Sequence, residues 1–370
     1  MKHRIVTLLC AALLALAAST AGLAGPAWPK GPISVLVGWA AGGASDIVSR
    51  ALALEMEKPL GTKIIVTNVT GALGAIAARQ VLSAPPDGYT WFGGAAVHGT
   101  WPLLGAGPVS WNNFYSWLAV MFPTTIYVRA DSPWRTIEDL LAEIKAKPGK
   151  LKYGHPGPGS NGEIFAGVLL ATAGLKGQAI SIPYSGGREA GKYLLGKEID
   201  FISVTMGDVT DWAKAGLLRP LANLYTKPMK FEGVEFRPIT EVFPKLAPLT
   251  AINPFFGIYV NRKTPDDIVV KITEAFIYAV KQERFRKIAV EERAGVLMPL
   301  FGIESDKMMS KIESARSWPP FELGIAPLNP SKLGIPRLEE WKWPPHARAE
   351  FLKPWPEQVE VMFRKLRAPS

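Results

Sequence analysis

The chain has 370 residues, of which 48% are hydrophobic and 20% are charged, and its formal net charge is +10. This length exceeds what one hydrophobic core usually supports, so we expect two lobes, and the hydrophobic content excludes a disordered chain. A single cysteine, Cys10, excludes a disulfide framework or a multi-cysteine metal site. The Lys and Arg residues are scattered, which argues against nucleic-acid binding, and we expect no cofactor.

Residues 1–24 have the pattern of a secretory signal peptide. Lys2 and Arg4 precede an apolar run over 5–18, and small residues follow. The run is shorter than the about 20 apolar residues that cross a bilayer, although an uncleaved anchor is the alternative. Cys10 lies inside the run and lacks the small preceding residue of a lipoprotein site. We therefore expect this segment to be cleaved and the mature protein to be periplasmic.

Strands and helices alternate in the first part of the chain. Apolar runs over 33–37, 63–68 and 89–93 predict strands, and helical patterns over 45–58 and 71–82 lie between them. Glycine occurs at the turn into each helix. The order of strand, glycine turn, helix and strand predicts a parallel sheet with right-handed crossovers.

A second set of elements begins near Thr125. Further strands are predicted over 125–128, 151–154, 179–183, 199–204 and 255–260, and helices over 137–145, 162–173 and 265–281. The repeated use of strand, glycine loop and helix indicates a second α/β lobe.

Residues 317–370 differ in composition from the rest, with 10 of the 32 prolines and 4 of the 12 tryptophans. Such a segment cannot form a regular core, but it can wrap one. We expect it to lie along the protein surface, and docking to a partner is the alternative.

The stretch Gly38–Asp46 follows the first predicted strand and contains Gly42-Gly43. Glycines allow a tight turn, and the first N–H groups of the helix that begins there have no partner within the helix. Such a turn binds an anion through main-chain amides and the helix dipole. Capping of the helix by Ser45 or Asp46 is the alternative. The spacing is neither that of a dinucleotide fingerprint nor that of a phosphate loop.

Three more glycine-containing loops open helices or follow strands, over 68–74, 157–161 and 183–188. Loops at the carboxyl ends of parallel strands gather in one crevice. Several amide-rich helix starts around one cleft indicate a receptor for a small carboxylate.

Six short motifs occur in a fixed order between residue 29 and about residue 316. They are Gly42-Gly43-x-x-Asp46, Asn68-x-x-Gly71-Ala72-x-Gly74, Pro85-Pro86-Asp87-Gly88-Tyr89-Thr90, Lys147-Pro148-Gly149-Lys150-Leu151-Lys152-Tyr153, Pro183-Tyr184-x-Gly186 and Leu195-Gly196-x-x-Ile199-Asp200. Each motif alone is unspecific, but the ordered set is specific. With it the chain resembles the substrate-binding proteins of tripartite tricarboxylate transporters, often called Bug proteins.

The resemblance implies a two-lobed α/β binding protein of the type II-like periplasmic kind, each lobe a mainly parallel sheet flanked by helices. Lobe 1 would comprise 29–124 and 254–316, and lobe 2 would comprise 125–253. The crossings near Pro123-Thr124-Thr125 and Asn253-Pro254 would form the hinge of a cleft that closes on its ligand.

The function implied is that of a monomeric, non-enzymatic receptor. It captures a small carboxylate or related organic solute and delivers it to the subunits of a membrane transporter. A periplasmic sensor that presents the solute to a signalling partner is an alternative. A hydrolase with Ser45, His98 and Asp46 as a triad is another, although no G-x-S-x-G or H-E-x-x-H motif is present.

The resemblance also implies which residues meet the ligand. The amides of the first loop hold a carboxylate, and the loop that opens the helix at 162 contacts the ligand from lobe 2. The predicted set is Trp39, Ala40, Gly42, Gly43, Ala44, Ser45, Gly159, Ser160, Asn161, Ser185, Arg188 and Thr205. We expect a β-branched residue at Gly43 to weaken binding, because the position needs unusual torsions or a close ligand approach.

Several side chains near the predicted cleft have two interpretations. Arg188 either binds a second ligand carboxylate or is a solvated surface residue. The aromatic residues Trp39, Phe92 and Phe255 either line the cleft or belong to the core. The two histidines in nearby loops, His98 and His155, are either ligand donors or turn residues at the rim.

The sequence departs from the family pattern at three places. Gly38 and Trp39 replace a proline and a phenylalanine, and Val204-Thr205 replaces an Asp-Asn pair. Glu163 stands where a histidine is common. This acid either points away as a first-turn helix residue or binds a positive or hydroxyl group of the ligand.

Overall fold

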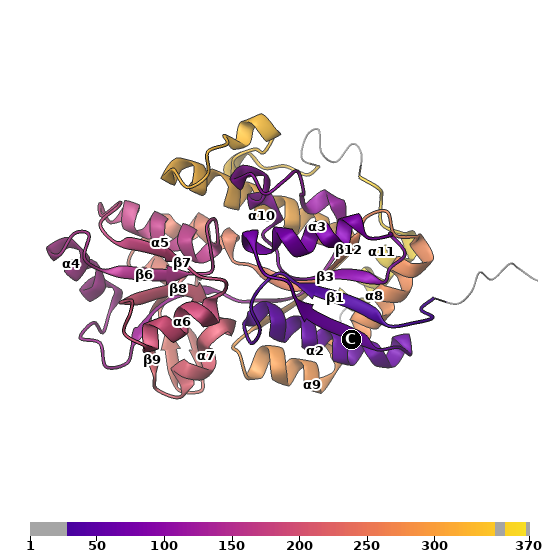
Figure 1. The fold of residues 1–370 in the computed structure, drawn as a ribbon, viewed down its shortest axis with the longest axis horizontal. Coiled ribbons are helices and arrows are strands. Elements are labelled where there is room, and N and C mark those ends of the chain that lie inside the picture. Colours follow the sequence, from indigo (N-terminus) through magenta and orange to yellow (C-terminus); the bar gives the residue numbers. More distant parts are fainter. Residues whose placement is uncertain (1–27, 345–351, 368–370) are drawn as a thin grey trace, which may run out of the picture.

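The computed structural model describes residues 28–344 and 352–367. The predicted signal peptide, residues 1–24, lies outside them. The elements form two α/β lobes side by side (Figure 1), so the expected two-lobed α/β class is confirmed. None of the helices within the described ranges has the length and apolar character of a membrane span.

Lobe 1 is built on a six-stranded sheet in the order β13-β4-β12-β3-β1-β2. Its strands are β1 (Ile33–Val37), β2 (Ile64–Asn68), β3 (Thr90–Ala95), β4 (Phe114–Met121), β12 (Phe255–Asn261) and β13 (Val296–Leu300). The central strand β1 pairs in parallel with β2 and β3, whereas β12 is antiparallel to β3 and β4.

Lobe 2 is built on a five-stranded sheet in the order β7-β6-β8-β5-β9. Its strands are β5 (Thr124–Arg129), β6 (Lys152–His155), β7 (Ile180–Pro183), β8 (Phe201–Thr205) and β9 (Leu218–Asn223), with a hairpin of β10 (Met229–Phe231) and β11 (Val234–Phe236). β6 is parallel to β7 and β8, and β5 is antiparallel to β8 and β9.

The two sheets are therefore mixed, and the expectation of mainly parallel sheets is corrected. β5 and β12 are the strands that enter a lobe from the other one. β5 begins at Thr124, opposite Thr205, where β8 ends, and Phe256 near the start of β12 lies opposite Ala95, where β3 ends. Because an entering strand starts at the edge where its neighbours finish, it must pair with them antiparallel.

Helices flank both sheets, and Figure 1 shows α2 and α3 on opposite sides of the lobe 1 sheet. The helices are α2 (Ala44–Leu60), α3 (Ala75–Ser83), α4 (Ile137–Ala146), α5 (Asn161–Thr172), α6 (Gly187–Leu195), α7 (Met206–Lys214), α8 (Asp266–Lys281), α9 (Glu283–Arg286), α10 (Ile303–Leu323) and α11 (Glu357–Arg367). Several of them start at the carboxyl end of a strand, which places their unpaired N–H groups between the lobes.

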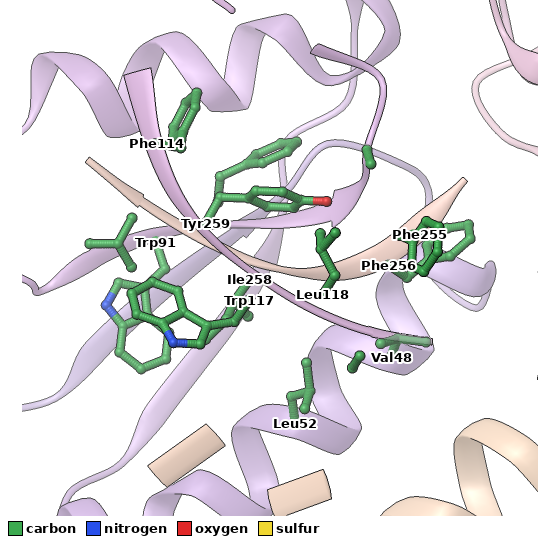
Figure 2. Packing of buried hydrophobic residues seen from close by; sticks show 14 of the residues in the cluster. Val48, Leu52, Trp91, Phe114, Trp117, Leu118, Phe255, Phe256, Ile258 and Tyr259 are labelled. Carbon is green, nitrogen blue, oxygen red and sulfur yellow. The ribbon is translucent and has the colours of Figure 1, made fainter. Parts of the chain in front are cut away.

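The core of lobe 1 is rich in aromatic residues. Figure 2 shows Val48 and Leu52 of α2 near the strands that carry Trp117, Leu118 and Ile258, and all five side chains are at most 1% exposed. Large aromatic and aliphatic groups buried to this extent dominate the packing energy of a lobe. The sheet therefore holds the loops at its carboxyl end in fixed positions.

The chain crosses between the lobes twice, and hydrogen bonds join the two crossings. Asn253 accepts from the Thr124 amide through Oδ1 at 2.9 Å and donates from Nδ2 to the Leu224 carbonyl at 2.5 Å. The Phe122 amide donates to the Pro254 carbonyl at 3.4 Å. The crossings therefore lie side by side, and hinge bending at this point stays a prediction.

α10 runs continuously to Leu323, across the predicted boundary between residues 316 and 317, and the division of the chain into lobes and a C-terminal extension stays a prediction. Beyond this helix, Trp355 is 7% exposed and packs edge-on against Tyr115 and Trp117, with ring centroids 4.7 and 5.2 Å away. Its Nε1 donates to Asp306 Oδ2 at 3.0 Å. The stretch around Trp355 thus packs on lobe 1, whereas Leu338 of the same segment packs against the core of lobe 2.

We predict that Trp355→Ala lowers the free energy of unfolding by about 3–5 kcal/mol, because it leaves a cavity beside Tyr115 and Trp117. Urea denaturation measures this loss. Trp355→Phe keeps most of the ring contact and loses only the hydrogen bond, so it should cost less. A loss under about 1 kcal/mol for the alanine variant would show that this segment does not stabilise lobe 1.

Candidate functional site

The lobes meet at a small pocket, here called the inner pocket, at the carboxyl ends of their parallel strands. Nine of the predicted residues line it: Trp39, Ala40, Gly43, Ala44 and Ser45 from lobe 1, and Ser160, Asn161, Arg188 and Thr205 from lobe 2. Eight further residues line it that were not predicted to contact the ligand: Leu73, Ala95, Val97, Pro156, Gly186, Gly187, Asp208 and Phe256. About 30 Å³ inside it is open to the centre of a water molecule, which is room for about two waters.

A second pocket of about 520 Å³ adjoins the first and is here called the outer pocket. The two share Trp39, Leu73 and Pro156. The rest of the outer pocket is lined by Gly38, Thr70, Gly71, Ala72, Leu104, Ala106, Gly157, Pro158, Pro183, Tyr184, Ser185 and Glu189. The space between the lobes is therefore a narrow inner end with a wider opening.

Hydrogen bonds hold the lobes together around the inner pocket. The Ala44 amide at the start of α2 donates to Asp208 Oδ1 of lobe 2 at 2.9 Å. Arg293 Nη1 of lobe 1 donates to Asp211 Oδ1 of lobe 2 at 3.1 Å. These contacts and the small inner volume indicate a closed arrangement.

The loop before α2 is held by Asp46. The Gly42 amide donates to Asp46 Oδ2 at 3.0 Å, and Arg50 Nε and Asn68 Nδ2 both donate to Asp46 Oδ1 at 2.9 Å. Burial by itself raises the pKa of Asp46, but the hydrogen bonds from Arg50, Gly42 and Asn68 outweigh it and lower the pKa. Asp46 is therefore ionised and holds the loop in place. Because the Gly42 amide donates to Asp46, it is not available to a ligand.

Two loop amides remain available to a ligand. The amides of Gly43 and Ser45 have no acceptor among the described residues, and both residues line the inner pocket. Gly43 has φ −83°, an ordinary extended value, so the expected torsional need at this position is wrong and belongs to Gly42, with φ +78°. A Cβ on Gly43 would instead lie 3.1 Å from Asp208 Oδ1.

Asp208 is the main feature that the sequence analysis missed. It is the third residue of α7, is 7% exposed, and accepts from Thr205 Oγ1 at 2.6 Å as well as from Ala44. Burial raises its pKa, although its hydrogen bonds and the Arg188 charge act in the opposite direction. The Thr205-x-x-Asp208 spacing of a capping box was the available signal in the sequence.

Arg188 lines the inner pocket but is already paired. Its Nη1 and Nη2 each donate to Asp211 at 2.9 Å, and Nη1 also donates to the Asp208 carbonyl at 3.1 Å. The guanidinium lies over the Trp212 ring, 4.3 Å from its centroid. The Nε–H has no acceptor in the described residues, so one donor of the side chain faces no protein partner. Arg188 is neither a free carboxylate clamp nor a solvated surface residue.

Three residues predicted to contact the ligand, Gly42, Gly159 and Ser185, do not line the inner pocket. Glu163 Oε2 accepts from the Gly159 amide at 2.7 Å, so this acid points at its own loop, and neither residue lines the pocket. The Gly42 amide likewise donates to an acid of its own loop, Asp46, and Gly42 does not line the inner pocket. Ser185 lies on the outer pocket, where its amide and hydroxyl donate to Glu189.

The aromatic candidates divide between cleft and core. Trp39 lines both pockets and is 8% exposed. Phe92 and Phe255 are buried in the core and line neither pocket, whereas Phe256, the neighbour of Phe255, lines the inner one. Strand alternation decides this, because consecutive side chains of β12 point to opposite faces.

Neither histidine lies at the rim of the cleft, which corrects that expectation. His98 is 1% exposed, packs against aromatic rings including Phe92 and Trp101, and burial lowers its pKa to about 3. His155 is wholly buried, with Nε2 2.8 Å from Ser181 Oγ, and burial lowers its pKa to about 4. Both are therefore neutral core residues.

The hydrolase triad does not form in the described part of the chain. Asp46 bonds to Arg50 and Asn68, and both ring nitrogens of His98 lack a partner there. The described residues also contain no cluster of three or more His, Cys, Asp or Glu placed to hold a metal ion. The groups that the cleft presents to a solute are main-chain amides, the Asp208 carboxyl group and apolar side chains.

Two α/β lobes with a cleft at their strand ends define the class of two-domain solute-binding proteins. Residues 48–299 match the family model described as "Tripartite tricarboxylate transporter family receptor" (TctC). This match covers well over half of the chain, and the chain belongs to this family. The resemblance drawn from the ordered motifs is confirmed.

Individual proteins agree with this assignment. A curated relative from Cupriavidus necator, described as "UPF0065 protein in gbd 5'region", is 32% identical over 75% of this chain and 83% of its own length. A TctC solute-binding protein from Polaromonas, solved without ligand, is 29% identical with a TM-score of 0.57, over 81% of this chain and 99% of that one. An R. palustris protein solved with adipate shares the fold, at 21% identity and a TM-score of 0.72, over 82% of this chain and 100% of that one.

We predict that Asp208→Asn raises the melting temperature at pH 7 and that the gain shrinks as the pH falls towards 4. The folded state raises the pKa of Asp208 above its ordinary value of 3.8. The stability that the protonated Asp208 contributes is therefore fully present below pH 3.8, and it is lost as the pH rises through the raised pKa of the folded state. The asparagine cannot titrate and avoids this loss.

Melting curves between pH 4 and 8 measure the effect. Asp200→Asn is the control, because it removes a carboxylate just before β8, at the end of that strand far from the cleft. If the wild type and Asp208→Asn keep a constant difference across this range, Asp208 does not titrate with folding.

Proposed function

We propose that the chain is a periplasmic receptor that captures a small organic acid between its lobes and delivers it to a tripartite membrane transporter. The observation that carries the proposal is the pair of unpaired amides, Gly43 and Ser45, at the start of α2 in the wall of an interlobe pocket. Amides at a helix start bind anionic groups without a free arginine. The family match and the adipate held by the R. palustris protein support a carboxylate as that group.

The remaining walls suit the carbon skeleton of such a solute. Leu73, Val97 and Phe256 are apolar residues of the inner pocket, and Trp39 continues the apolar surface into the outer pocket. Most small-molecule sites combine an apolar lining with a few fixed polar groups. A solute too long for the inner pocket extends into the outer pocket.

Closure of the lobes provides the mechanism of capture. The ligand touches residues of both lobes only when they are together, so binding shifts the population towards the closed form. The inner pocket is too small in the closed structure for a solute to enter. Entry therefore requires opening at the crossings near Thr124 and Asn253. No covalent step is involved.

We predict that calorimetry will detect binding of at least one member of a panel of mono-, di- and tricarboxylates, and that Gly43→Val weakens it at least about tenfold. The valine would crowd Asp208 and reach into the space in front of the two free amides. Gly31→Ala is the matched control, because no atom lies within 4 Å of a Cβ there. Unchanged affinity in Gly43→Val would remove the loop from the site, and turnover of esters or amides would instead support the hydrolase alternative.

Delivery to a transporter predicts that uptake of the bound solute depends on this protein. Membrane vesicles that contain the transporter's large and small subunits should accumulate the labelled solute only when the purified protein is added. Gly43→Val should reduce the initial rate at limiting solute in line with its lower affinity. Equal uptake with and without the protein would favour a role in sensing.

A further inference from the structure

A carboxylate of the protein lies among the amides that would receive the acid group of a solute. Asp208 Oδ1 accepts from the Ala44 amide at 2.9 Å, and a Cβ on Gly43 would lie 3.1 Å from the same oxygen. Ala44 stands in the chain between Gly43 and Ser45, whose amides are free of protein acceptors in the described part of the chain. An acid group held by those two amides is therefore a direct neighbour of Asp208 Oδ1.

The inner pocket is too small to keep two negative charges apart. Its open volume of about 30 Å³ holds about two waters, which is roughly the space of the two oxygens of one acid group. Asp208 cannot withdraw while the lobes are closed, because its Oδ2 accepts from Thr205 Oγ1 at 2.6 Å and would lie 2.2 Å from a Cβ on Gly187. The acid groups of protein and solute are therefore side by side with little water between them.

The charged groups around Asp208 do not compensate a second negative charge. On α6, Arg188 forms a two-point pair with Asp211 and reaches Asp208 only at the main-chain carbonyl. Arg293 of lobe 1 pairs with the same Asp211. On β5, burial raises the pKa of the nearby Tyr127, so its hydroxyl stays neutral. An extra charge at this point has to be removed by a proton.

Two carboxylates in one poorly hydrated site cannot both ionise, and the pair keeps one proton. Burial of Asp208 raises its pKa even before a solute is present, although its hydrogen bonds act in the opposite direction. When the lobes part, the bond to Ala44 breaks and water solvates the carboxylate, which then ionises at neutral pH as an ordinary aspartate does. Closure on an ionised acid group therefore takes one proton from the solvent.

We propose that the receptor binds the acid group of its solute together with one proton, which Asp208 and the solute share. The proton lies between Asp208 Oδ1 and the nearer solute oxygen, and the solute oxygens accept from the Gly43 and Ser45 amides. This inference rests on the proposed function, because it concerns the protonation of the same site. The bound proton makes an acid of the protein at this helix start compatible with an anionic solute.

Calorimetry of the full-length mature protein in buffers of low and high ionisation enthalpy, phosphate and imidazole, counts the protons. The probe is whichever of acetate, valerate, benzoate and adipate binds most tightly. At pH 6.5 we expect an uptake of more than about half a proton per bound probe, since a second carboxylate and burial raise a carboxyl pKa by several units. For the same reason the affinity should fall at least about fourfold between pH 6.5 and 8.5.

Asp208→Asn keeps the size and the acceptor oxygen but removes the charge. It should bind the probe without proton uptake, with an affinity that is constant from pH 6.5 to 8.5 and tighter than that of the wild type at pH 8.5. Glu163→Gln is the matched control, because burial also raises the pKa of Glu163, yet this residue lines neither pocket. It should keep the uptake of the wild type.

Histidines near the cleft do not add to the proton count. Burial lowers the pKa of His98 to about 3 and that of His155 to about 4, so both are neutral throughout this range. Far-ultraviolet circular dichroism shows whether each variant is folded, and Asp208→Ser is a second neutral variant if the asparagine is not. The count in the wild type needs no variant.

The outcomes separate this inference from the proposed function. Binding by the wild type without proton uptake overturns the shared proton and leaves a carboxylate receptor in which the solute displaces Asp208. Uptake that persists in Asp208→Asn also overturns it, because the proton then binds elsewhere. Absence of binding by all four probes overturns both.

Discussion

The hydrogen bond from the Ala44 amide to Asp208 is the constraint on which the cleft depends. It joins the first helix of lobe 1 to the first turn of α7 in lobe 2, at the point where both lobes offer their unpaired groups. An isolated buried carboxylate is costly, so it must keep this partner or lose its charge. The closed arrangement, the small inner pocket and the charge balance of the site all follow from where this one carboxylate lies.

Much of the fold could be predicted from the sequence. The apolar runs at 33–37 and 255–260 became β1 and β12, and the order of glycine motifs was sufficient to recognise the family. Strand direction was harder, because a chain that passes between lobes inverts the strand that follows each crossing. The change of composition after residue 316 did not reveal where the helix ends, because Pro319 and Pro320 lie inside α10.

The sequence predicted which loops meet at the pocket between the lobes, and contact of their residues with a ligand stays a prediction. Nine of the twelve named residues line the inner pocket, because loops at strand ends must converge there. Which amides stay free could not be read from the loops, since Gly42 and Gly159 are each bonded by an acid four residues later. Asp208 contacts Ala44 across a separation of 164 residues, and only the closed arrangement of the lobes brings the two together.

The long helix α10 ties the C-terminal part of the chain to the cleft through Arg316, which is fully buried. Its guanidinium donates to the Ile252 carbonyl beside one crossing and to the Gly159 carbonyl of lobe 2, and burial lowers its pKa to about 9. Movement of the Gly159 loop away from α10 therefore has to break the hydrogen bond from Arg316, so this buried side chain couples the position of the C-terminal helix to that of the lobe 2 loop.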